Sequence, residues 1–178
     1  MLYLMAADFH GRMGAYKGLV KVVEKHKPDK VILLGDVIGG GTPYVINCEL
    51  AKIYAQILAV RGNCDTYSDF GLLDVGDVGT CYCEKIGERN VFFTHGHIYG
   101  RTAFPPFCER GDVIFYGHYH CPEIAVIRGV TCVCVGSMGL PCGGSEPSFC
   151  LFDGEKIEIR NMETDEIIVE VSLKEKDD

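Results

Sequence analysis

The chain begins with the run Leu2-Tyr3-Leu4-Met5-Ala6-Ala7-Asp8-Phe9-His10, in which an apolar stretch is followed by an acid and a histidine. An apolar run of this length is typical of a strand buried on both faces, as in a parallel sheet. Asp8 and His10 are two positions apart, so on an extended chain their side chains lie on the same side. The stretch therefore predicts a buried strand that carries two polar groups at its carboxyl end.

The segments that follow continue an alternation of strand and helix. Residues 30–35 and 57–60 are two more apolar runs, each followed by glycine and polar residues. Residues 15–26 and 43–57 are expected to form amphipathic helices, the second opened by Thr42-Pro43, a cap followed by a first-turn proline. This βαβαβ order predicts parallel strands joined by right-handed crossovers.

The second half of the chain is richer in strands. Short strands separated by turn signals are expected at 80–86, 90–94, 112–116, 123–128, 131–135, 148–153, 155–160 and 167–173. One short helix is predicted near 101–109, broken by Pro105-Pro106, and the charged tail 174–178 is expected to fray. We expect one domain over residues 1–178, of the α/β class with an α+β second half, in which two β-sheets pack together with helices outside.

Composition narrows the class of protein. The net charge of −8 disfavours a nucleic-acid polymer as partner, because such binding needs a basic surface. No apolar run approaches the roughly 18 residues of a membrane span, and no signal peptide is apparent. Ten cysteines without a C-x-x-C pair are typical of small buried residues in a reducing compartment, so we expect a cytoplasmic protein.

Histidine and carboxylate side chains recur where the predicted strands end. The positions are Asp8, His10, Asp36, Asn63, His95, His118 and His120. In an open α/β sheet, ligands bind beyond the carboxyl ends of the strands. Imidazole and carboxylate are also the groups that hold borderline divalent metals. Scattered capping residues are the alternative, which is disfavoured because five strand ends repeat one chemistry.

Seven such ligands suit two cations with open positions for water and substrate, rather than one closed structural site. Asp36 could bridge two cations with its two oxygens, while Asn63 adds an uncharged oxygen. Two divalent cations against Asp8 and Asp36 leave about +2 in the pocket, which attracts a phosphate ester. The pattern therefore predicts phosphoester hydrolysis by a water activated between two metals.

These fragments resemble, in order, the signature of calcineurin-like metallophosphoesterases. The matching motifs are Asp8-x-His10, Gly35-Asp36, Gly62-Asn63-Cys64-Asp65, His95-Gly96-His97 and Gly117-His118-Tyr119-His120. The short length and the Gly-Asn-Cys-Asp variant are similar to the YfcE-type phosphodiesterases of bacteria and archaea. The resemblance implies a four-layer αββα sandwich of two mixed β-sheets, a dinuclear site and, commonly, homo-oligomers.

The resemblance also assigns ligands. It implies one metal on Asp8, His10, Asp36 and His120, and the other on Asp36, Asn63, His95 and His118. Nitrogen and oxygen ligands accept manganese, nickel, iron, zinc or cobalt, and manganese is the favoured expectation.

The chain departs from the protein phosphatases of this superfamily, which carry Gly-Asn-His-Glu. Cys64-Asp65 stands at that position, so protonation of the leaving group falls to His97, Asp65 or a metal-bound water, with Asn63 as a further catalytic candidate. Cys64 is disfavoured as a nucleophile because no base pairs with it. His26, among lysines on a helix, is expected to be solvated.

The leading hypothesis is a phosphodiesterase that hydrolyses small organic phosphodiesters through a hydroxide bridging two divalent metals. Two alternatives remain open. One is a phosphomonoesterase for nucleotides or sugar phosphates. The other is a non-catalytic scaffold similar to the retromer subunit Vps29.

Overall fold

The computed structural model of the protein describes residues 1–173, and the predicted tail of residues 174–178 lies outside this range. The elements are β1 (Tyr3–Ala6), α1 (Met13–His26), β2 (Lys30–Leu34), α2 (Pro43–Leu50), β3 (Gln56–Val60), α3 (Tyr67–Phe70), β4 (Gly76–Asp77), β5 (Cys81–Ile86), β6 (Arg89–Thr94), β7 (Val113–Tyr116), β8 (Pro122–Ile127), β9 (Val130–Val135), β10 (Ser148–Phe152), β11 (Lys156–Asn161) and β12 (Ile167–Ser172). None of the helices within residues 1–173 has the length and apolar character needed to cross a bilayer.

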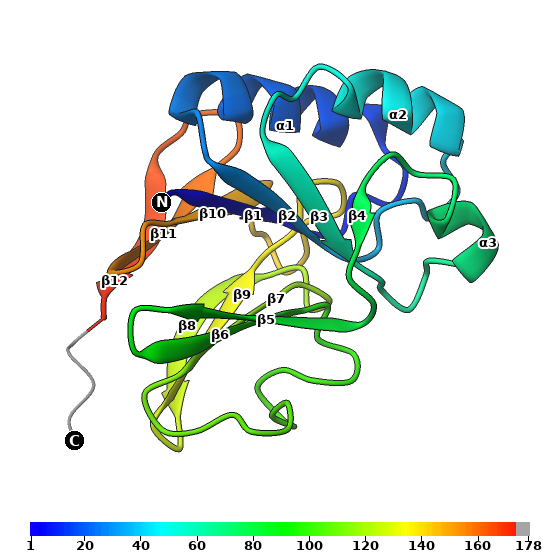
Figure 1. The fold of residues 1–178 in the computed structure, drawn as a ribbon. Coiled ribbons are helices and arrows are strands. Elements are labelled where there is room, and N and C mark those ends of the chain that lie inside the picture. Colours follow the sequence, from blue (N-terminus) through cyan, green and yellow to red (C-terminus); the bar gives the residue numbers. More distant parts are fainter. Residues whose placement is uncertain (174–178) are drawn as a thin grey trace.

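The strands form two mixed sheets that lie face to face (Figure 1). The seven-stranded sheet has the order β12-β11-β10-β1-β2-β3-β4, and β1 to β4 run parallel in it. β10 pairs antiparallel with β1, so the C-terminal strands return to the sheet that the N-terminus begins. The five-stranded sheet has the order β5-β6-β7-β9-β8, with β6, β7 and β9 parallel.

Alternate residues of β1 build the two sides of the core. Leu4 packs in the cluster that joins the seven-stranded sheet to α1 and α2, whereas Met5 packs in the cluster between the sheets. This division follows from the strand, in which successive side chains point to opposite faces. Both helices cover the outer face of the seven-stranded sheet (Figure 1). The expected sandwich of two mixed sheets with helices outside is confirmed.

The prediction of a short helix near 101–109 is wrong, because this segment consists of bends and turns. Pro105 and Pro106 remove two amide donors in succession, which an α-helix of this length cannot replace. The segment still covers the outer face of the five-stranded sheet, where Phe104 and Cys108 pack against the buried residues of β6, β7 and β9.

The second predicted helix is too long. α2 ends at Leu50, and residues 56–60 form β3 instead of continuing the helix to 57. The amide of Ile53 donates to the carbonyl of Leu50, which closes the helix with a tight turn. β3 then pairs with β2 from Gln56 onward. Tertiary pairing thus outweighs the local apolar pattern that favoured helix. The sequence also did not predict α3 or β4.

Glu84 of β5 joins the two sheets, and its replacement is expected to lower stability. Its carboxylate lies 2.8 Å from Lys30 Nζ of β2 and accepts from the Tyr3 hydroxyl of β1 at 3.1 Å. Burial alone would raise the pKa of Glu84, but the hydrogen bonds from Lys30 and Tyr3 outweigh it and lower that pKa below 4.5. The folded state is therefore stabilised above pH 4.5, and this contribution is lost as pH falls through the lower pKa of the folded state.

We expect Glu84→Gln to reduce the free energy of unfolding by about 1 kcal/mol at pH 7 and by much less near pH 3. Urea unfolding at the two pH values measures the difference. Glu88→Gln, at an exposed position of the same hairpin, is the matched control. An equal loss at both pH values would contradict the ion pair as the cause.

Candidate metal centre

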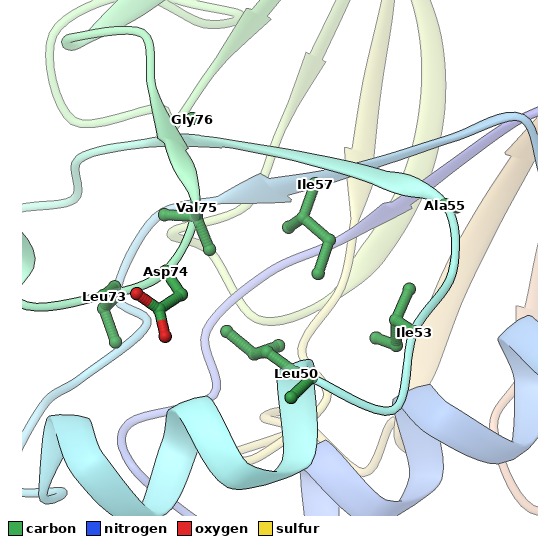
Figure 2. A pocket seen from close by; sticks show the side chains of 9 residues that line it. Leu50, Ile53, Ala55, Ile57, Leu73, Asp74, Val75 and Gly76 are labelled. Atoms are coloured by element: carbon green, nitrogen blue, oxygen red, sulfur yellow. The ribbon is translucent and has the colours of Figure 1, made fainter.

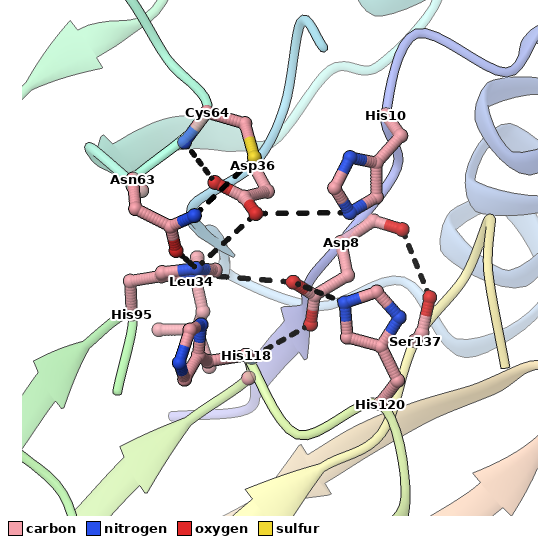
Figure 3. Close-up of polar contacts among 12 residues, drawn as sticks. Asp8, His10, Leu34, Asp36, Asn63, Cys64, His95, His118, His120 and Ser137 are labelled. Atoms are coloured by element: carbon pink, nitrogen blue, oxygen red, sulfur yellow. Dashed lines mark hydrogen bonds and ion pairs between the residues drawn. The ribbon is translucent and has the colours of Figure 1, made fainter. Parts of the chain in front are cut away.

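Polar groups that follow five strands of the two sheets lie together (Figure 3). Asp8, Asp36 and Asn63 follow β1, β2 and β3 of the seven-stranded sheet. His95 directly follows β6, and the His118–His120 segment follows β7, both in the five-stranded sheet. The facing of the two sheets thus brings together groups that are far apart in the sequence.

Asp8 lies at the centre of the group and is fully buried. Its Oδ2 accepts a hydrogen bond from the amide of His118 at 2.9 Å. Its Oδ1 lies 3.3 Å from Nε2 of His120 and 4.0 Å from Nδ1 of His95. The carboxylate therefore has one oxygen fixed by the backbone and one that faces the histidines.

Asp36 is held in the same manner. Its Oδ1 accepts from the amide of Cys64 at 2.8 Å, while Oδ2 lies 3.4 Å from Nε2 of His95 and 3.7 Å from Nε2 of His10. Burial by itself would raise the pKa of Asp36, but the hydrogen bond with His95, the charge of that ring and the Cys64 amide outweigh burial and hold the pKa below its ordinary value. The surroundings of Asp36 therefore favour its carboxylate form.

The rings of two histidines are oriented by backbone carbonyls. Nδ1 of His95 donates to the carbonyl of Leu34 at 2.8 Å, and Nδ1 of His120 donates to the carbonyl of Leu140. A carbonyl oxygen only accepts, so the proton on each ring belongs on Nδ1 and Nε2 is the nitrogen turned to the centre. Carbonyls that orient histidine ligands in this manner are common around metals.

Nitrogen and oxygen atoms of several side chains converge at the centre of the site. Nε2 of His95 lies 3.0 Å from the amide oxygen of Asn63 and 3.4 Å from Asp36 Oδ2. Within residues 1–173, the buried atoms Asp8 Oδ1 and His10 Nε2 have no hydrogen-bond partner. Buried acceptors that face one another need a positive charge between them, either a proton or a cation. The donor set of carboxylate, amide and imidazole therefore fits divalent cations.

The possible ligand atoms fall into overlapping groups, in each of which all atoms lie within 4.8 Å of one another. One group is Asp8, His10 and His120, and another is Asp8, Asp36 and His95. A third joins His10 and Asp36 to Cys64. The groups overlap, because Asp8, His10 and Asp36 each belong to two of them.

His118 is located by the position of its ring and by the contact of its backbone amide. Its ring centroid lies 5.1 Å from that of His95, and its amide holds Asp8. Burial and the charge of His95 lower the pKa of the His118 ring. The structure thus brings all seven predicted ligands to one place, His118 by ring proximity.

Several of these residues have a backbone conformation that residues other than glycine rarely adopt. Positive φ angles between 47° and 66° occur at Asp8, His10, Asp36, His118 and His120. Such conformations cost free energy and persist where surrounding structure enforces them, which is common at functional sites. The turns after β1, β2 and β7 are therefore shaped for the position of these side chains.

Glycines allow the close approach of the turns. A Cβ atom on Gly62 would lie 2.1 Å from Oδ1 of Asp36, and one on Gly117 would lie 2.5 Å from Oδ2 of Asp8. A Cβ atom on Gly35 would meet Nδ1 of His95 at 2.6 Å. Each of these glycines therefore leaves the space that a carboxylate or imidazole of the site occupies.

The predicted catalytic residues lie in different environments. His97 is exposed, and its ring centroid lies 5.2 Å from that of His95. Burial and the charges of His95 and His118 lower the pKa of His97. Asp65 accepts from the amides of Ile38 at 3.0 Å and Gly62 at 2.9 Å. Because both oxygens of Asp65 are engaged by the backbone, its contacts favour a structural role that joins two turns of the site.

His26 is not solvated as expected. Its Nε2 lies 2.8 Å from Asp165 Oδ1, its side chain is 15% exposed, and its ring packs against Phe149. It is remote from the predicted ligands in the fold, at the C-terminus of α1. The helix pattern gave no sign of this contact because Asp165 lies 139 residues further along the chain.

Sequence reasoning missed Ser137 as a supporting residue. Its hydroxyl donates to the carbonyl of Asp8 at 2.9 Å and accepts from the amide of Leu140 at 2.8 Å. Leu140 in turn orients His120. The Val135-Gly136-Ser137 turn at the end of β9 was the available signal, but the sequence did not show which turn Ser137 would hold.

A separate hollow lies between α2 and β3, away from these residues (Figure 2). It is lined largely by aliphatic side chains, including Leu50, Ile53 and Ile57. None of the predicted ligands lines it.

A family model for the calcineurin-like phosphoesterase superfamily domain matches residues 1–156. The chain belongs to this superfamily. It is similar to phosphodiesterase YfcE of Escherichia coli (strain K12), with 27% identity over 183 residues that cover 97% of this chain and 98% of that protein. A solved structure of E. coli Yfce, a phosphoesterase, matches with a TM-score of 0.89 at 26% identity, covering 98% of this chain and 100% of that chain. The expected resemblance to YfcE-type metallophosphoesterases is confirmed.

Two further matches are lower in coverage or in sequence identity. A probable metallophosphoesterase, YsnB of Bacillus subtilis (strain 168), is 33% identical over 91 residues, or 46% of this chain and 47% of that protein. Vps29 from Entamoeba histolytica, solved in complex with Zn²⁺, matches with a TM-score of 0.65 at 20% identity over 98% of this chain and 100% of that chain. This second likeness shows the fold alone.

Proposed function

We propose that the protein is a metal-dependent phosphodiesterase that hydrolyses small organic phosphodiesters at a pair of divalent cations. The observation that carries this proposal is the convergence of carboxylate, amide and imidazole groups in overlapping sets of possible ligand atoms. The similarity to phosphodiesterase YfcE over nearly the whole chain supports the same reaction.

In this proposal one cation is held by Asp8, His10, Asp36 and His120. The other is held by Asp36, Asn63, His95 and His118. Two such cations would attract the phosphate oxygens and lower the pKa of a bound water, which would supply the nucleophile. Manganese is the favoured metal, with nickel, iron, zinc and cobalt also compatible with nitrogen and oxygen ligands.

The remaining residues prepare the site. The carbonyls of Leu34 and Leu140 hold the Nδ1 hydrogen of His95 and His120, so that Nε2 of each ring is turned inward and would be the nitrogen that binds a cation. Burial of Asp8 and Asp36 excludes water from their carboxylates, which strengthens their attraction for cations. We propose the cytoplasm as the location, because all ten cysteines are free. A homo-oligomer stays a prediction.

The proposal is tested with protein stripped by a chelator and reloaded with manganese. We expect two equivalents of metal by elemental analysis and hydrolysis of bis(p-nitrophenyl) phosphate that the chelator abolishes. Faster turnover of p-nitrophenyl phosphate would favour the phosphomonoesterase alternative instead. Protein that stays metal-free and inactive with every metal tested would leave the scaffold alternative.

His97 is proposed to assist the leaving oxygen, since its exposed ring lies beside His95. We expect His97→Gln to slow hydrolysis of a dialkyl phosphodiester by about a hundredfold or more, because an alkoxide needs a proton as it departs. The same variant should lose less than about tenfold with bis(p-nitrophenyl) phosphate, because nitrophenolate departs unprotonated. His26→Gln is the control. Equal losses on both substrates would argue against proton donation.

A further inference from the structure

Cys121 and Cys142 touch each other beside the His120 turn. The thiol of Cys121 donates to the carbonyl oxygen of Cys142 at 3.1 Å, and the amide of Cys142 donates to the carbonyl of His120 at 3.2 Å. The path from the α-carbon of Cys142 through that hydrogen bond to the α-carbon of Cys121 contains only a few backbone bonds. Their standard lengths limit the separation of the two α-carbons to roughly 7 Å, close to the range that disulfides span. Cys142 is exposed and Cys121 is partly exposed, so both thiols can meet a reagent.

The segment that carries Cys142 also holds the ring of His120. Leu140, two residues before Cys142, accepts from Nδ1 of His120. Ser145, three residues after Cys142, donates from its hydroxyl to the carbonyl of His120 at 3.1 Å. The two cysteines therefore lie on the two segments whose contact fixes this histidine.

The turn after Cys142 can change shape. Gly143 and Gly144 both have positive φ angles, at 64° and 80°, and Cβ space at Gly144 is open. Glycine adopts many backbone conformations at low cost. On the C-terminal side of Cys142, these two glycines can therefore accommodate a movement of Cys142 toward Cys121.

We propose that Cys121 and Cys142 form a reversible disulfide site, closed by a disulfide co-reactant such as oxidised glutathione. One protein thiol, as its thiolate, attacks oxidised glutathione, forms a mixed disulfide and releases one glutathione. The second protein thiol attacks the sulfur of the first, which forms the protein disulfide and releases the other glutathione. The two protein thiols are oxidised by two electrons, and their two hydrogens leave on two reduced glutathione molecules.

Formation of the disulfide changes the contacts that hold the ring of His120. The hydrogen bond from Cys121 to the Cys142 carbonyl is lost, because the sulfur no longer carries a hydrogen. Cys142 is drawn toward Cys121, and Leu140 moves with it because only Pro141 separates them. The acceptor of the His120 ring is thereby displaced in the oxidised form.

The pair is tested by peptide mapping of metal-free protein equilibrated with reduced and oxidised glutathione. We expect the dominant cross-linked peptide to join Cys121 to Cys142, with the mass of two hydrogens lost. Cys142→Ser should leave Cys121 as a glutathione adduct, whereas Cys48→Ser, at an exposed position on α2, should keep the cross-link. Glutathione adducts on both cysteines in the native protein, or a dominant link to another cysteine such as Cys64, would overturn the proposal.

The effect on the neighbouring turn is read by NMR of ¹⁵N-histidine protein without metal. Oxidation should shift the ring signals of His120 and leave those of His26, which pairs with Asp165, in place. These shifts should be absent in Cys142→Ser. A formed cross-link with unmoved His120 signals would overturn the coupling, and neither result depends on whether the protein hydrolyses phosphodiesters.

Discussion

Replacing Asp36 with asparagine is expected to lower manganese-dependent hydrolysis of bis(p-nitrophenyl) phosphate by more than about a hundredfold. Loss of a group that only supports a metal ligand typically costs about 10–100-fold, and Asp36 is proposed to contact both cations directly. Asparagine keeps an oxygen that can accept from the Cys64 amide, so the turn is preserved while the charge is removed. The change therefore tests the effect of the carboxylate charge alone.

The rate is measured together with manganese affinity by calorimetry, since loss of a ligand should reduce both. Asp74→Asn is the matched control, because its side chain is exposed and lies outside the site. The midpoint temperature of thermal unfolding of the metal-free variant should be close to that of the metal-free native protein. A variant that binds manganese and turns over at the native rate would contradict the role of Asp36.

Gly62→Ala is expected to damage the site through space alone. The added Cβ atom would lie 2.1 Å from Oδ1 of Asp36 and 2.3 Å from its backbone nitrogen. Since backbone cannot swing aside as a flexible side chain can, either Asp36 or the turn that carries Asn63 must shift. A displacement of about 1 Å in a catalytic group can cost about a hundredfold in rate, so a loss of that size is expected.

Overpacking should also lower the free energy of unfolding of Gly62→Ala by about 1–3 kcal/mol. Chemical denaturation and the hydrolysis assay measure the two effects on the same preparation. Gly40→Ala is the control, because a Cβ atom there meets nothing within 4 Å. Native activity in Gly62→Ala would show that the turn adapts and that its closeness to Asp36 is not required.

The position of the site could be predicted from the sequence because its groups follow apolar strands. Asp8 and Asp36 come directly after runs whose burial is evident from composition, and parallel strands end at a common edge. The left-handed backbone at these residues could not be predicted, because aspartate and histidine adopt it more often than most residues but still rarely. It arises from contacts such as the amide of Asp8 with the carbonyl of Gly35.

Long-range pairing accounts for most of the remaining differences. The apolar residues between Leu50 and Ile57 suggested helix, but pairing with β2 makes the end of that stretch a strand. The engaged carboxylate of Asp65 depends on Ile38, which lies in a different turn. Motif position alone could not separate a proton donor from a residue that holds two turns together.

The return of β10 to the side of β1 has a consequence for how the chain acquires its structure. Tyr3 pairs with Lys30 on one side and with Phe152 on the other, so one neighbour is synthesised early and the other near the end. Until the ribosome has released most of the polypeptide, one edge of this central strand is bare, a state prone to aggregation. Such high contact order predicts slow folding and a benefit from chaperones that shield the nascent edge.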